Sequence, residues 1–536
     1  MTRGLGMPRT RLHHLIEYSA AATPGAAALT YQEETLDYAA LWRRVAAVGA
    51  ALTRLGVRRG DRVAIFAEKR LETVLALFGT SVAEGLFVPI NPVLRAPQVG
   101  HILTDCTPRV LITTAERLAS LRSVLADGSI EHVLVIGDHG PSQTEREPGR
   151  SRPPEPHAWA DTVIMAEPEP GGHGVDADPA AILYTSGSTG RPKGVVLSHR
   201  NLIVGAESVA GYLGNDHSDV ILSVLPLSFD AGFSQLTTGF LSGAHVVLLN
   251  YLLPADVPRL CARHGVTGLT CVPPLWLQLT AVDWPDPARR SLRYFANTGG
   301  RMPRPTLDRL RALFPDALPY LMYGLTEAFR STFLDPAQVD LRPDSIGKAI
   351  PNAEILVLRP DGTRCEPGEE GELVHRGPLV SLGYWNDPVR TGERFRPLPT
   401  GPGAAVAWRQ PELAVWSGDR VVSDPEGYLY FVGRADEMIK TSGYRVSPTE
   451  IEEAAYATGM VRDAVALGVA DKRLGQRIVL LATENGHPLT AKALLTAMRR
   501  DLPHFQVPSQ VIVADEIPRS ANGKYDRARL RAELES

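Results

Sequence analysis

Cysteine is scarce in this sequence, and so are long runs of uncharged apolar residues. The 536 residues include four scattered cysteines: Cys106, Cys261, Cys271 and Cys365. Their spacing fits neither a disulfide framework nor a zinc site, which favours a reducing, cytoplasmic location. No apolar stretch approaches the roughly 20 residues that span a bilayer, so we expect no membrane span.

The sequence also lacks an excess of positive charge. Its formal net charge is -4 and it contains no long basic run, which leaves no electrostatic case for binding nucleic acid. The first residues include arginines, but His13, His14 and Glu17 interrupt the apolar core that a signal peptide needs. A chain of this length exceeds what one hydrophobic core usually supports, so at least two domains are expected.

Apolar runs that alternate with helical patterns predict parallel α/β units through most of the chain. The stretches "RVAIFA" and "VLITT" are typical of buried strands. Thr35 is placed to cap a helix over 36–55, with Gly56 as its stop. Residues 138–178 are rich in proline, glycine and charge, which indicates an exposed connection.

Short strands and hairpin signals replace this pattern after about residue 350. "ILVLRPDGTRCEPGEEGELVHRG" carries Asp361 and Gly362 between two alternating runs, and "SDPEGYLYFVGR" has the form of a second hairpin. We therefore expect a smaller β-rich subdomain. "SPTEIEEAAYA" then predicts a capping box from Ser447 to Glu450, with Pro448 at the first helical position, at the start of a final α/β domain.

Glycine and hydroxyl residues are concentrated in "YTSGSTGRPKG" (184–194). A Walker-type phosphate loop is excluded, because Arg191 and Pro192 precede Lys193 and the following "VVLSH" predicts a strand. One interpretation is a loop between two strands that surrounds the β- and γ-phosphates of ATP with amides, the Lys193 ammonium and four hydroxyls: Thr185, Ser186, Ser188 and Thr189. The other is a mobile Gly/Ser hairpin.

Five motifs in order resemble those of the adenylate-forming superfamily, which includes acyl-CoA synthetases, amino-acid adenylation domains and luciferases. After "YTSGSTGRPKG" come "YGLTEA" (323–328), "WSGDRV" (416–421), "GRADEMIKTSGYRVSPTEIE" (433–452) and "PRSANGKYDR" (518–527). The resemblance covers residues from about 10 to 530 and makes a generic α/β protein a poor alternative.

The resemblance implies an α/β fold in two parts. Residues 1–434 would form a large N-terminal domain of two α/β subdomains and a small β-barrel-like subdomain. Residues 435–536 would form a mobile, small α+β C-terminal domain with a catalytic lysine. The implied reaction is attack of a carboxylate on the α-phosphorus of ATP, which yields an acyl adenylate and pyrophosphate, followed by transfer to a thiol.

The resemblance also assigns roles in the nucleotide site. Thr326 would contact the α-phosphate and Glu327 would help to hold Mg²⁺, although the same residues could simply begin and cap a helix. Tyr323 would stack on adenine, and Gly299 and Gly300 would let the backbone approach the base. The alternatives are a core aromatic residue and a tight turn.

Further residues match the ribose, phosphate and lysine motifs. Asp419 would accept both ribose hydroxyls, Arg434 would reach the same sugar, and Gly187 belongs to the phosphate loop. Taken alone, Asp419 and Arg434 could be a surface ion pair. Lys524 would be the catalytic lysine that bridges the substrate carboxylate and the α-phosphate, although by itself it would be an exposed loop lysine.

The hinge motif implies a change of domain orientation. Asp436 would be the hinge about which the C-terminal domain rotates after adenylation, and Gly443 would then lie on the face presented to the thiol. Since the lysine motif lies close to Ser536, we expect no fused carrier domain, and the resemblance then implies an acceptor in trans: CoA or the phosphopantetheine of a discrete acyl carrier protein.

The identity of the acid depends on "LSFDAGF" (227–233), which resembles the Phe-Asp pattern of amino-acid adenylation domains. Asp230 would bind the substrate's amino group, or else merely cap the following helix. The resemblance places nine residues in the acid pocket: Asp230, Ala231, Ser234, Cys271, Ala296, Thr298, Met322, Arg330 and Ser331. Arg330 could pair with a second substrate carboxylate, or be a salt-bridged surface arginine.

Three other functions stay open at this point. The first is a conventional CoA ligase for a fatty or aryl acid, the second a luciferase-like oxidase, and the third a non-catalytic binding module. "YGLTEAFRSTFL" with "RPDSIGKAIPNAEILVL" is most similar to stand-alone ligases that accompany carrier proteins, including exosortase-associated acyl-CoA ligases.

Overall fold

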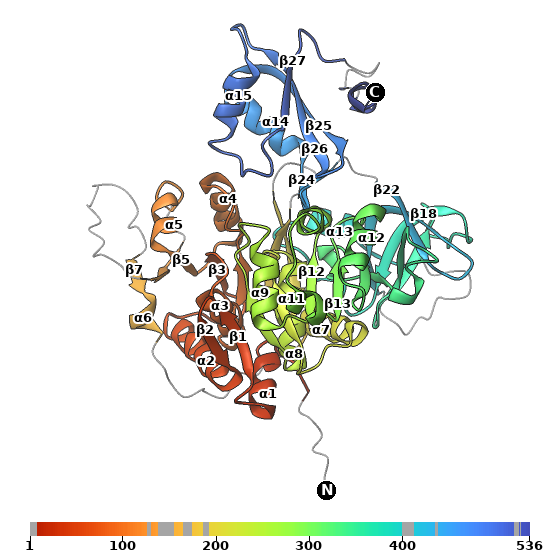
Figure 1. Cartoon of the computed structure of the whole chain (residues 1–536). Coiled ribbons are helices and arrows are strands. Elements are labelled where there is room, and N and C mark those ends of the chain that lie inside the picture. The colour runs from red at the N-terminus through yellow and green to blue at the C-terminus, as the bar shows by residue number, and fades with distance from the viewer. Residues whose placement is uncertain are drawn as a thin grey trace, which may run out of the picture.

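The computed structural model describes residues 8–125, 130–137, 155–163, 174–185, 192–398, 412–434, 438–518, 525 and 527–535. Most of the chain forms one large mixed α/β body, and the last part of the chain, blue in Figure 1, forms a smaller α+β unit beside it. This arrangement confirms the expected fold class. In the described residues, no helix is long and apolar enough to cross a membrane.

The first sheet has eight strands among the described residues, in the order β19-β9-β8-β4-β3-β5-β6-β7. Its centre is parallel, whereas β8 and β9 are antiparallel neighbours. The strands are β3 (Arg62–Phe66), β4 (Leu86–Pro89), β5 (Val110–Thr114), β6 (His132–Ile136), β7 (Glu155–Ala158), β8 (Pro179–Thr185), β9 (Lys193–Ser198) and β19 (Gly383–Tyr384). The helices of this part are α2 (Tyr38–Arg54), α3 (Leu71–Val82), α4 (Ala96–Cys106), α5 (Ala115–Ser120) and α6 (Trp159–Thr162).

The second sheet has a parallel centre in the order β11-β10-β12-β13-β14, with β1 and β2 at one edge. Its strands are β1 (Ala27–Tyr31), β2 (Glu34–Asp37), β10 (Val220–Ser223), β11 (His245–Leu248), β12 (Gly268–Cys271), β13 (Tyr294–Asn297) and β14 (Leu318–Tyr323). The helices are α1 (His14–Ala22), α7 (His199–Leu213), α8 (Asp230–Ser242), α9 (Asp256–His264), α10 (Pro273–Leu279), α11 (Asp286–Ser291) and α12 (Arg304–Leu313).

Antiparallel strands extend the second sheet instead of standing apart as a closed subdomain. The two predicted hairpins are confirmed, as β17 with β18 and as β21 with β22. However, β16 pairs with β15 on one side and with β22 on the other, so the strand order runs on from β14 without a break. The elements are η1 (Thr326–Ala328), β15 (Thr332–Leu334), η2 (Pro336–Gln338), β16 (Ser345–Ala349), β17 (Glu354–Leu358), β18 (Glu370–Arg376), α13 (Pro388–Arg394), β20 (Phe395–Pro397), β21 (Leu413–Ser423) and β22 (Leu429–Arg434).

The C-terminal unit is built on a third sheet, in the order β24-β23-β26-β25 with β27 beside β26. The long β25–β26 hairpin is its centre, and α14 packs against β25. The elements are β23 (Ile439–Thr441), β24 (Tyr444–Val446), α14 (Pro448–Ala457), β25 (Val461–Asp471), β26 (Gly475–Glu484), α15 (Ala491–Met498), β27 (Gln510–Val513) and α16 (Arg527–Glu535).

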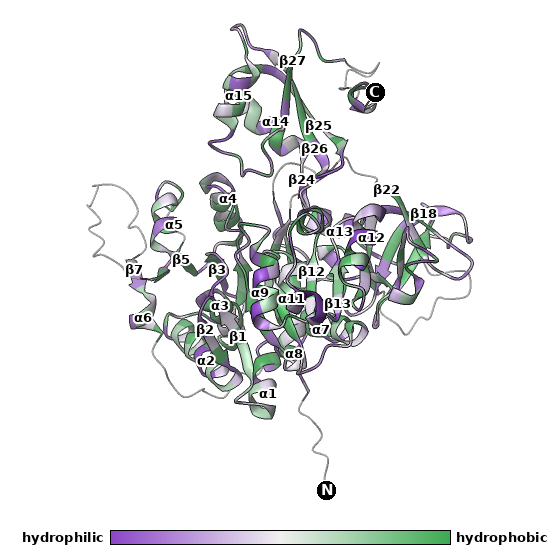
Figure 2. Cartoon of the chain, in the orientation of Figure 1, coloured by the Kyte–Doolittle hydropathy of each residue, from purple (hydrophilic) through white to green (hydrophobic). Residues whose placement is uncertain are grey.

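The two large sheets share a hydrophobic core. The ring of Phe78 on α3 lies 5.3 Å from the ring of Phe240 on α8, and Phe233 on α8 lies 5.0 Å from Phe87 on β4. Figure 2 shows the strands of this body mainly in hydrophobic colours, while helices such as α9 carry hydrophilic stretches. Because α3 and α8 pack together, the two sheets are held side by side as layers of one body.

Two local predictions, both of helix caps, were wrong in detail. Thr35 lies in β2 and Asp37 caps α2 instead, because residues 34–37 pair with β1. The predicted exposed connection over 138–178 contains β7 and α6 in its described part, where α6 has no buried residue, while residues 138–154 and 164–173 lie outside the described residues. Pro448 is the first residue of α14 as predicted, but Ser447 makes no side-chain cap bond.

Candidate active site

Loops at the carboxyl ends of the parallel strands build the candidate site. The segments that follow β10, β12, β13 and β14 contain "LSFDAGF", Val272, "TGGRMP" and "GLTEAFR" respectively. Carboxyl ends of adjacent parallel strands meet at one edge of a sheet, which is where open α/β sheets bind ligands. The fold therefore gathers motifs that are up to about 100 residues apart in the chain.

Lys193, Glu327 and Tyr384 form a buried polar cluster at this edge. The Lys193 ammonium donates to Glu327 Oε1 at 3.1 Å and to the Tyr384 hydroxyl at 2.6 Å, and that hydroxyl donates to Glu327 Oε1 at 2.7 Å. Burial alone would raise the pKa of Glu327, but the charges of Lys193, Arg394 and Arg445 outweigh it and hold this pKa well below its usual range. Glu327 is therefore an ionised carboxylate inside the protein.

The glycine-rich stretch connects two antiparallel strands, as the sequence predicted. Thr185 ends β8, Lys193 begins β9, and the two residues are paired in register. The predicted phosphate-loop residues between them lie outside the described residues: Ser186, Gly187, Ser188 and Thr189. Lys193 thus holds a fixed position at the base of the loop and points its ammonium toward Glu327.

The residues predicted for adenosine also come together. The Tyr323 hydroxyl donates to Asp419 Oδ2 at 2.5 Å, and Asp419, 3% exposed, faces Arg434 across the β21–β22 ladder. The side chain of Arg434 lies outside the described residues. Gly299 has a φ of +74°, which only glycine adopts readily, so the turn after β13 requires it.

Asp230 and Arg330 form an ion pair in which Arg330 is buried and the Asp230 side chain is 16% exposed. The Arg330 guanidinium donates from Nη1 to Asp230 Oδ2 at 3.3 Å, and Arg330 is 3% exposed, which rules out a surface arginine. Burial raises the pKa of Asp230, while the Arg330 charge and a hydrogen bond from the Ala231 backbone amide oppose part of that rise. The cap alternative is wrong: Phe229 is the N-cap residue of α8, and Asp230 is already helical.

Phe329 holds a strained backbone between Glu327 and Arg330. Its φ is +56° and its side chain is fully buried, a rare combination for an aromatic residue. A Cβ on Gly205 of α7 would lie 2.5 Å from the Phe329 ring, so the glycine leaves the room this ring occupies. The strain turns the chain so that Glu327 faces Lys193 while Arg330 faces Asp230.

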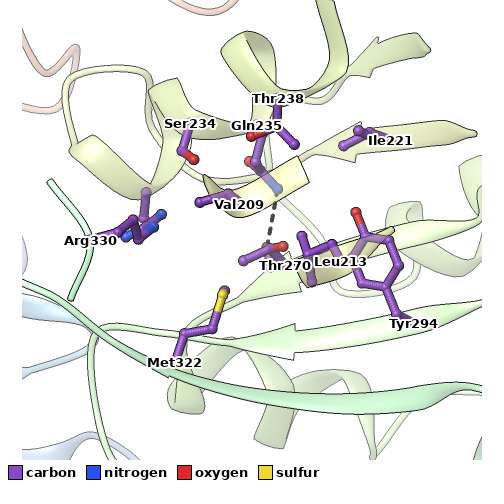
Figure 3. A pocket seen from close by; sticks show the side chains of 11 residues that line it. Val209, Leu213, Ile221, Ser234, Gln235, Thr238, Thr270, Tyr294, Met322 and Arg330 are labelled. Atoms are coloured by element: carbon purple, nitrogen blue, oxygen red, sulfur yellow. Dashed lines mark hydrogen bonds between the residues drawn. The ribbon is translucent and has the colours of Figure 1, made fainter. Parts of the chain in front are cut away.

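A narrow pocket continues from this ion pair between α7, α8 and strands β10, β12, β13 and β14 (Figure 3). Four of the nine residues predicted for the acid pocket line it: Ala231, Ser234, Met322 and Arg330. The other five do not: Asp230 pairs with Arg330 outside the lining, and four are buried elsewhere, namely Cys271, Ala296, Thr298 and Ser331. Ser331 instead bonds to His375, with 2.9 Å between Oγ and Nδ1.

Sequence reasoning missed several polar residues here. Gln235 and Thr238 line the pocket from α8 and Thr270 lines it from β12. On α8, the residues Ala231, Ser234, Gln235 and Thr238 follow the spacing i, i+3, i+4, i+7, which places them on one helix face. This spacing was the signal available in the sequence. Lys69 was missed because nothing local marks it.

Lys69 anchors the loop that leads to Asp230. Its ammonium donates to the carbonyl of Ser223 at 2.9 Å and to that of Leu225 at 3.1 Å, both at the end of β10. Burial lowers the pKa of Lys69 to about 7. The contact ties the first sheet to the Asp230 loop of the second.

The C-terminal unit touches the site through the β23–β24 hairpin. Tyr444 packs edge-on against Phe229, with 5.5 Å between ring centres, and a Cβ on Gly443 would lie 2.9 Å from Val272. The hairpin therefore presents the predicted thiol-facing segment to the mouth of the site. Asp436 and Lys524 lie outside the described residues.

Comparison with known proteins matches this architecture. The model of the AMP-binding enzyme family matches residues 16–385, and the model of the AMP-binding enzyme C-terminal domain matches residues 450–524. The chain belongs to the AMP-binding enzyme family. Within that family it is an ATP-dependent, AMP-forming ligase, which activates an acid as an acyl adenylate and transfers it to the thiol of CoA or of a carrier protein.

Two relatives of different specificity are equally similar to the chain. It is 29% identical to a long-chain-fatty-acid–CoA ligase of Salmonella typhimurium, over 97% of this chain and 94% of that protein. It is also 29% identical to an L-proline–[L-prolyl-carrier protein] ligase of Pseudomonas fluorescens, over 98% of this chain and 99% of that protein. Overall identity does not decide between these two kinds of acid.

Solved structures of o-succinylbenzoate CoA synthetase from Bacillus subtilis, 25% identical, differ in their likeness to this chain. The double mutant bound to the product analogue OSB-NCoA has a TM-score of 0.81 and covers 97% of this chain and 98% of its own. The complex with the acyl-adenylate intermediate OSB-AMP has a TM-score of 0.67 and covers 96% and 97%. The chain is thus arranged more like the product-analogue complex.

Proposed function

We propose that this ligase activates an amino acid and loads it onto the phosphopantetheine thiol of a separate carrier protein. The observation that carries the proposal is the Asp230 carboxylate, which is 16% exposed and lies next to two residues that line the acid pocket, Ala231 and Arg330. A buried carboxylate is expensive unless a cation meets it, and a substrate ammonium is such a cation. Arg330 then balances the charge of this carboxylate before the substrate arrives.

In this proposal the nucleotide side of the site provides binding and charge. Asp419 and Tyr323 receive the nucleoside, and Lys193 and Thr185 flank the phosphate loop. Glu327 would hold Mg²⁺, since an ionised oxygen ligand suits that ion, and the bound ion would offset charge at the α-phosphate. Thr326, next to Glu327 in η1, would donate to the same phosphate.

The transfer step would use the arrangement observed. The β23–β24 hairpin lies against Phe229 and Val272, at the mouth of the site, and Gly443 is its closest point. The higher TM-score to the product-analogue complex supports an assignment of this arrangement to thiol transfer. Adenylation would then need a rotation about Asp436 that brings Lys524 to the substrate carboxylate.

A second candidate is a CoA ligase for an acid without an amino group. The closed pair of Asp230 and Arg330 favours it, because a carboxylate already met by a guanidinium needs no substrate cation. The substrate class distinguishes the two candidates, so one substitution at Asp230 tests both.

The test is Asp230→Asn, which keeps the shape of the side chain. We expect a loss of about ten- to a hundredfold or more in kcat/KM for amino acids, since a charge-assisted bond contributes roughly 1.5 to 3 kcal/mol. The affinity for ATP, measured in parallel as the control, should not change. Preference of the wild-type enzyme for acids without an amino group, with equal turnover by the variant, would establish the second candidate.

A further inference from the structure

The acid pocket contains polar atoms that no described residue satisfies. Gln235 Oε1 and Thr238 Oγ1 are buried and have no hydrogen-bond partner among the described residues, and the same holds for Arg330 Nε. Gln235 is 5% and Thr238 is 3% exposed. A buried polar atom without a partner is costly, so these atoms indicate a polar ligand.

The orientation of Gln235 is determined by its neighbours. Its Nε2 lies 3.2 Å from the carbonyl of Leu222 and 3.3 Å from the carbonyl of Thr270, and two carbonyls can only face a donor. Figure 3 shows the bond to Thr270 and the side chain of Thr238 beside it. The remaining Oε1 of Gln235 must therefore accept a hydrogen bond, while the Thr238 hydroxyl can donate one.

The pocket is too small for a fatty chain. Its cavity of about 20 Å³ is only slightly larger than the roughly 10–15 Å³ that one ordered water needs, so it admits no more than the polar end of a short side chain. Figure 3 places Arg330 and Met322 at one end of the pocket and Tyr294 with Ile221 at the other. A long acyl tail would have to displace these side chains.

The helix gives a measure of the ligand's length. Asp230 and Thr238 are eight residues apart on α8, so the helix rises about 12 Å between their Cα atoms; because side chains lean toward the N-terminus of a helix by similar amounts, we take this rise as the separation of their polar ends. After two hydrogen bonds of about 2.9 Å each are subtracted, about 6 Å remain between the two polar groups of a ligand that reaches both. That is the span from the amino nitrogen to the end of a side chain of glutamine length.

We infer that Gln235 and Thr238 determine specificity for an amino acid whose side chain has about the length of glutamine and ends in a neutral group that both donates and accepts hydrogen bonds. A primary amide or a hydroxyl meets this condition: its hydrogen binds Gln235 Oε1 and its oxygen accepts from Thr238. A terminal carboxylate or a hydrocarbon does not. The amino-acid part of this inference rests on the proposed function, whereas the terminal group does not.

Four acids separate the two questions: glutamine, 2-amino-5-methylhexanoate, 4-carbamoylbutanoate and 5-methylhexanoate. The first two carry an amino group, and the first and third carry the terminal amide in place of a branched hydrocarbon of similar shape. We expect kcat/KM for pyrophosphate release to favour the amide of each pair at least tenfold. The two pairs are glutamine with 2-amino-5-methylhexanoate and 4-carbamoylbutanoate with 5-methylhexanoate. Equal kcat/KM within each pair, or a higher value for the hydrocarbon, would overturn the inference whether or not the enzyme prefers amino acids.

Thr238→Val and Thr238→Ser form the matched variants. The valine variant keeps the shape and loses the hydroxyl, so its amide preference should fall to within about threefold, while its amino preference stays. The serine variant should retain both preferences. If the valine variant keeps the full amide preference, Thr238 does not determine it and the inference fails. Should the valine variant not fold, the four-acid comparison on the wild-type enzyme still decides.

Discussion

Glu450 is a buried carboxylate that bears on stability more than on chemistry. It lies in the first turn of α14, and burial raises its pKa from an ordinary value near 4.5 to about 7, although a bond from Gln506 opposes this. The native state thus favours the protonated form. The predicted capping box does not form: Ser447 makes no side-chain cap bond, and Glu450 has a hydrogen bond with Gln506.

Glu450→Gln should therefore remove the free-energy cost of burying an ionised carboxylate, a cost that the wild-type protein bears only at higher pH. A raised native pKa contributes stability below about pH 4.5, and this contribution is lost as the pH rises through 7. The variant should match the wild-type protein at pH 5 and exceed it at pH 8 by roughly 1–3 kcal/mol in the free energy of unfolding. Urea unfolding of the whole chain at both pH values checks this.

The exposed neighbour Glu453 supplies the control. Glu453→Gln removes the same charge from the same helix without burial, and its effect should be within about 0.5 kcal/mol at both pH values. A Glu450→Gln variant that is no more stable than the wild-type protein at pH 8 would show that Glu450 is solvated in the native state.

At the scale of elements, the contact between α7 and the segment after β14 holds the two halves of the site in place. Gly205 on α7 leaves space for the Phe329 ring, and Phe329 accepts a φ of +56°. Glu327 and Arg330 lie on either side of it, so a shift of this ring moves both the carboxylate that meets Lys193 and the guanidinium that meets Asp230.

Gly205→Ala should push the Phe329 ring and cost about 1–3 kcal/mol of stability. Activity should fall more than stability explains, because both flanking side chains move. Gly211→Ala lies on the same helix with nothing within 4 Å of the added Cβ, and it should stabilise by roughly 0.5–1 kcal/mol. Thermal unfolding and pyrophosphate release measure the two effects, and equal activity of both variants would argue against the role given to Phe329.

At the scale of the whole molecule, the C-terminal unit has to serve two half-reactions. The structure presents the β23–β24 hairpin to the site, and Gly443 approaches Val272 with a φ of +81°. Both features demand glycine at this position. The docked arrangement should therefore depend on this one residue more than on the remainder of the hairpin.

Gly443→Ala should impair thiol transfer and leave adenylation closer to normal. Gly459→Ala provides the matched control, since Gly459 has a φ of +69° in the same unit but no atom within 4 Å of an added Cβ. Both variants carry the backbone strain, and Gly443→Ala alone meets Val272. Thioester formation and pyrophosphate release are measured separately, and thioester formation should fall more than pyrophosphate release only in Gly443→Ala. If Gly459→Ala shows the same loss of thioester formation, backbone strain is the cause.

Lys524→Ala should have the opposite effect from Gly443→Ala: adenylation should be lost and thiol transfer retained. If Lys524 bridges the carboxylate and the α-phosphate during adenylation, the variant loses pyrophosphate release by orders of magnitude and still transfers the acyl group from a pre-made acyl adenylate. Equal loss of the two half-reactions would contradict a role confined to adenylation.

Local patterns in the sequence determined the elements and the class of chemistry. The buried strands β3 and β5, the hairpins at Gly362 and Gly427 and the strands on either side of "YTSGSTGRPKG" follow from apolar runs and turn residues, which act over a few positions. The ordered motifs likewise indicated an adenylate-forming ligase, and the family match bears this out.

Only the tertiary structure decided which of these residues meet. It paired Arg330 with Asp230, joined Tyr384 to Lys193 and Glu327, and turned Gln235 and Thr238 into the acid pocket. These partners are up to 191 residues apart, as for Lys193 and Tyr384. Their proximity depends on the packing of two sheets and on the strain at Phe329, which no local propensity encodes.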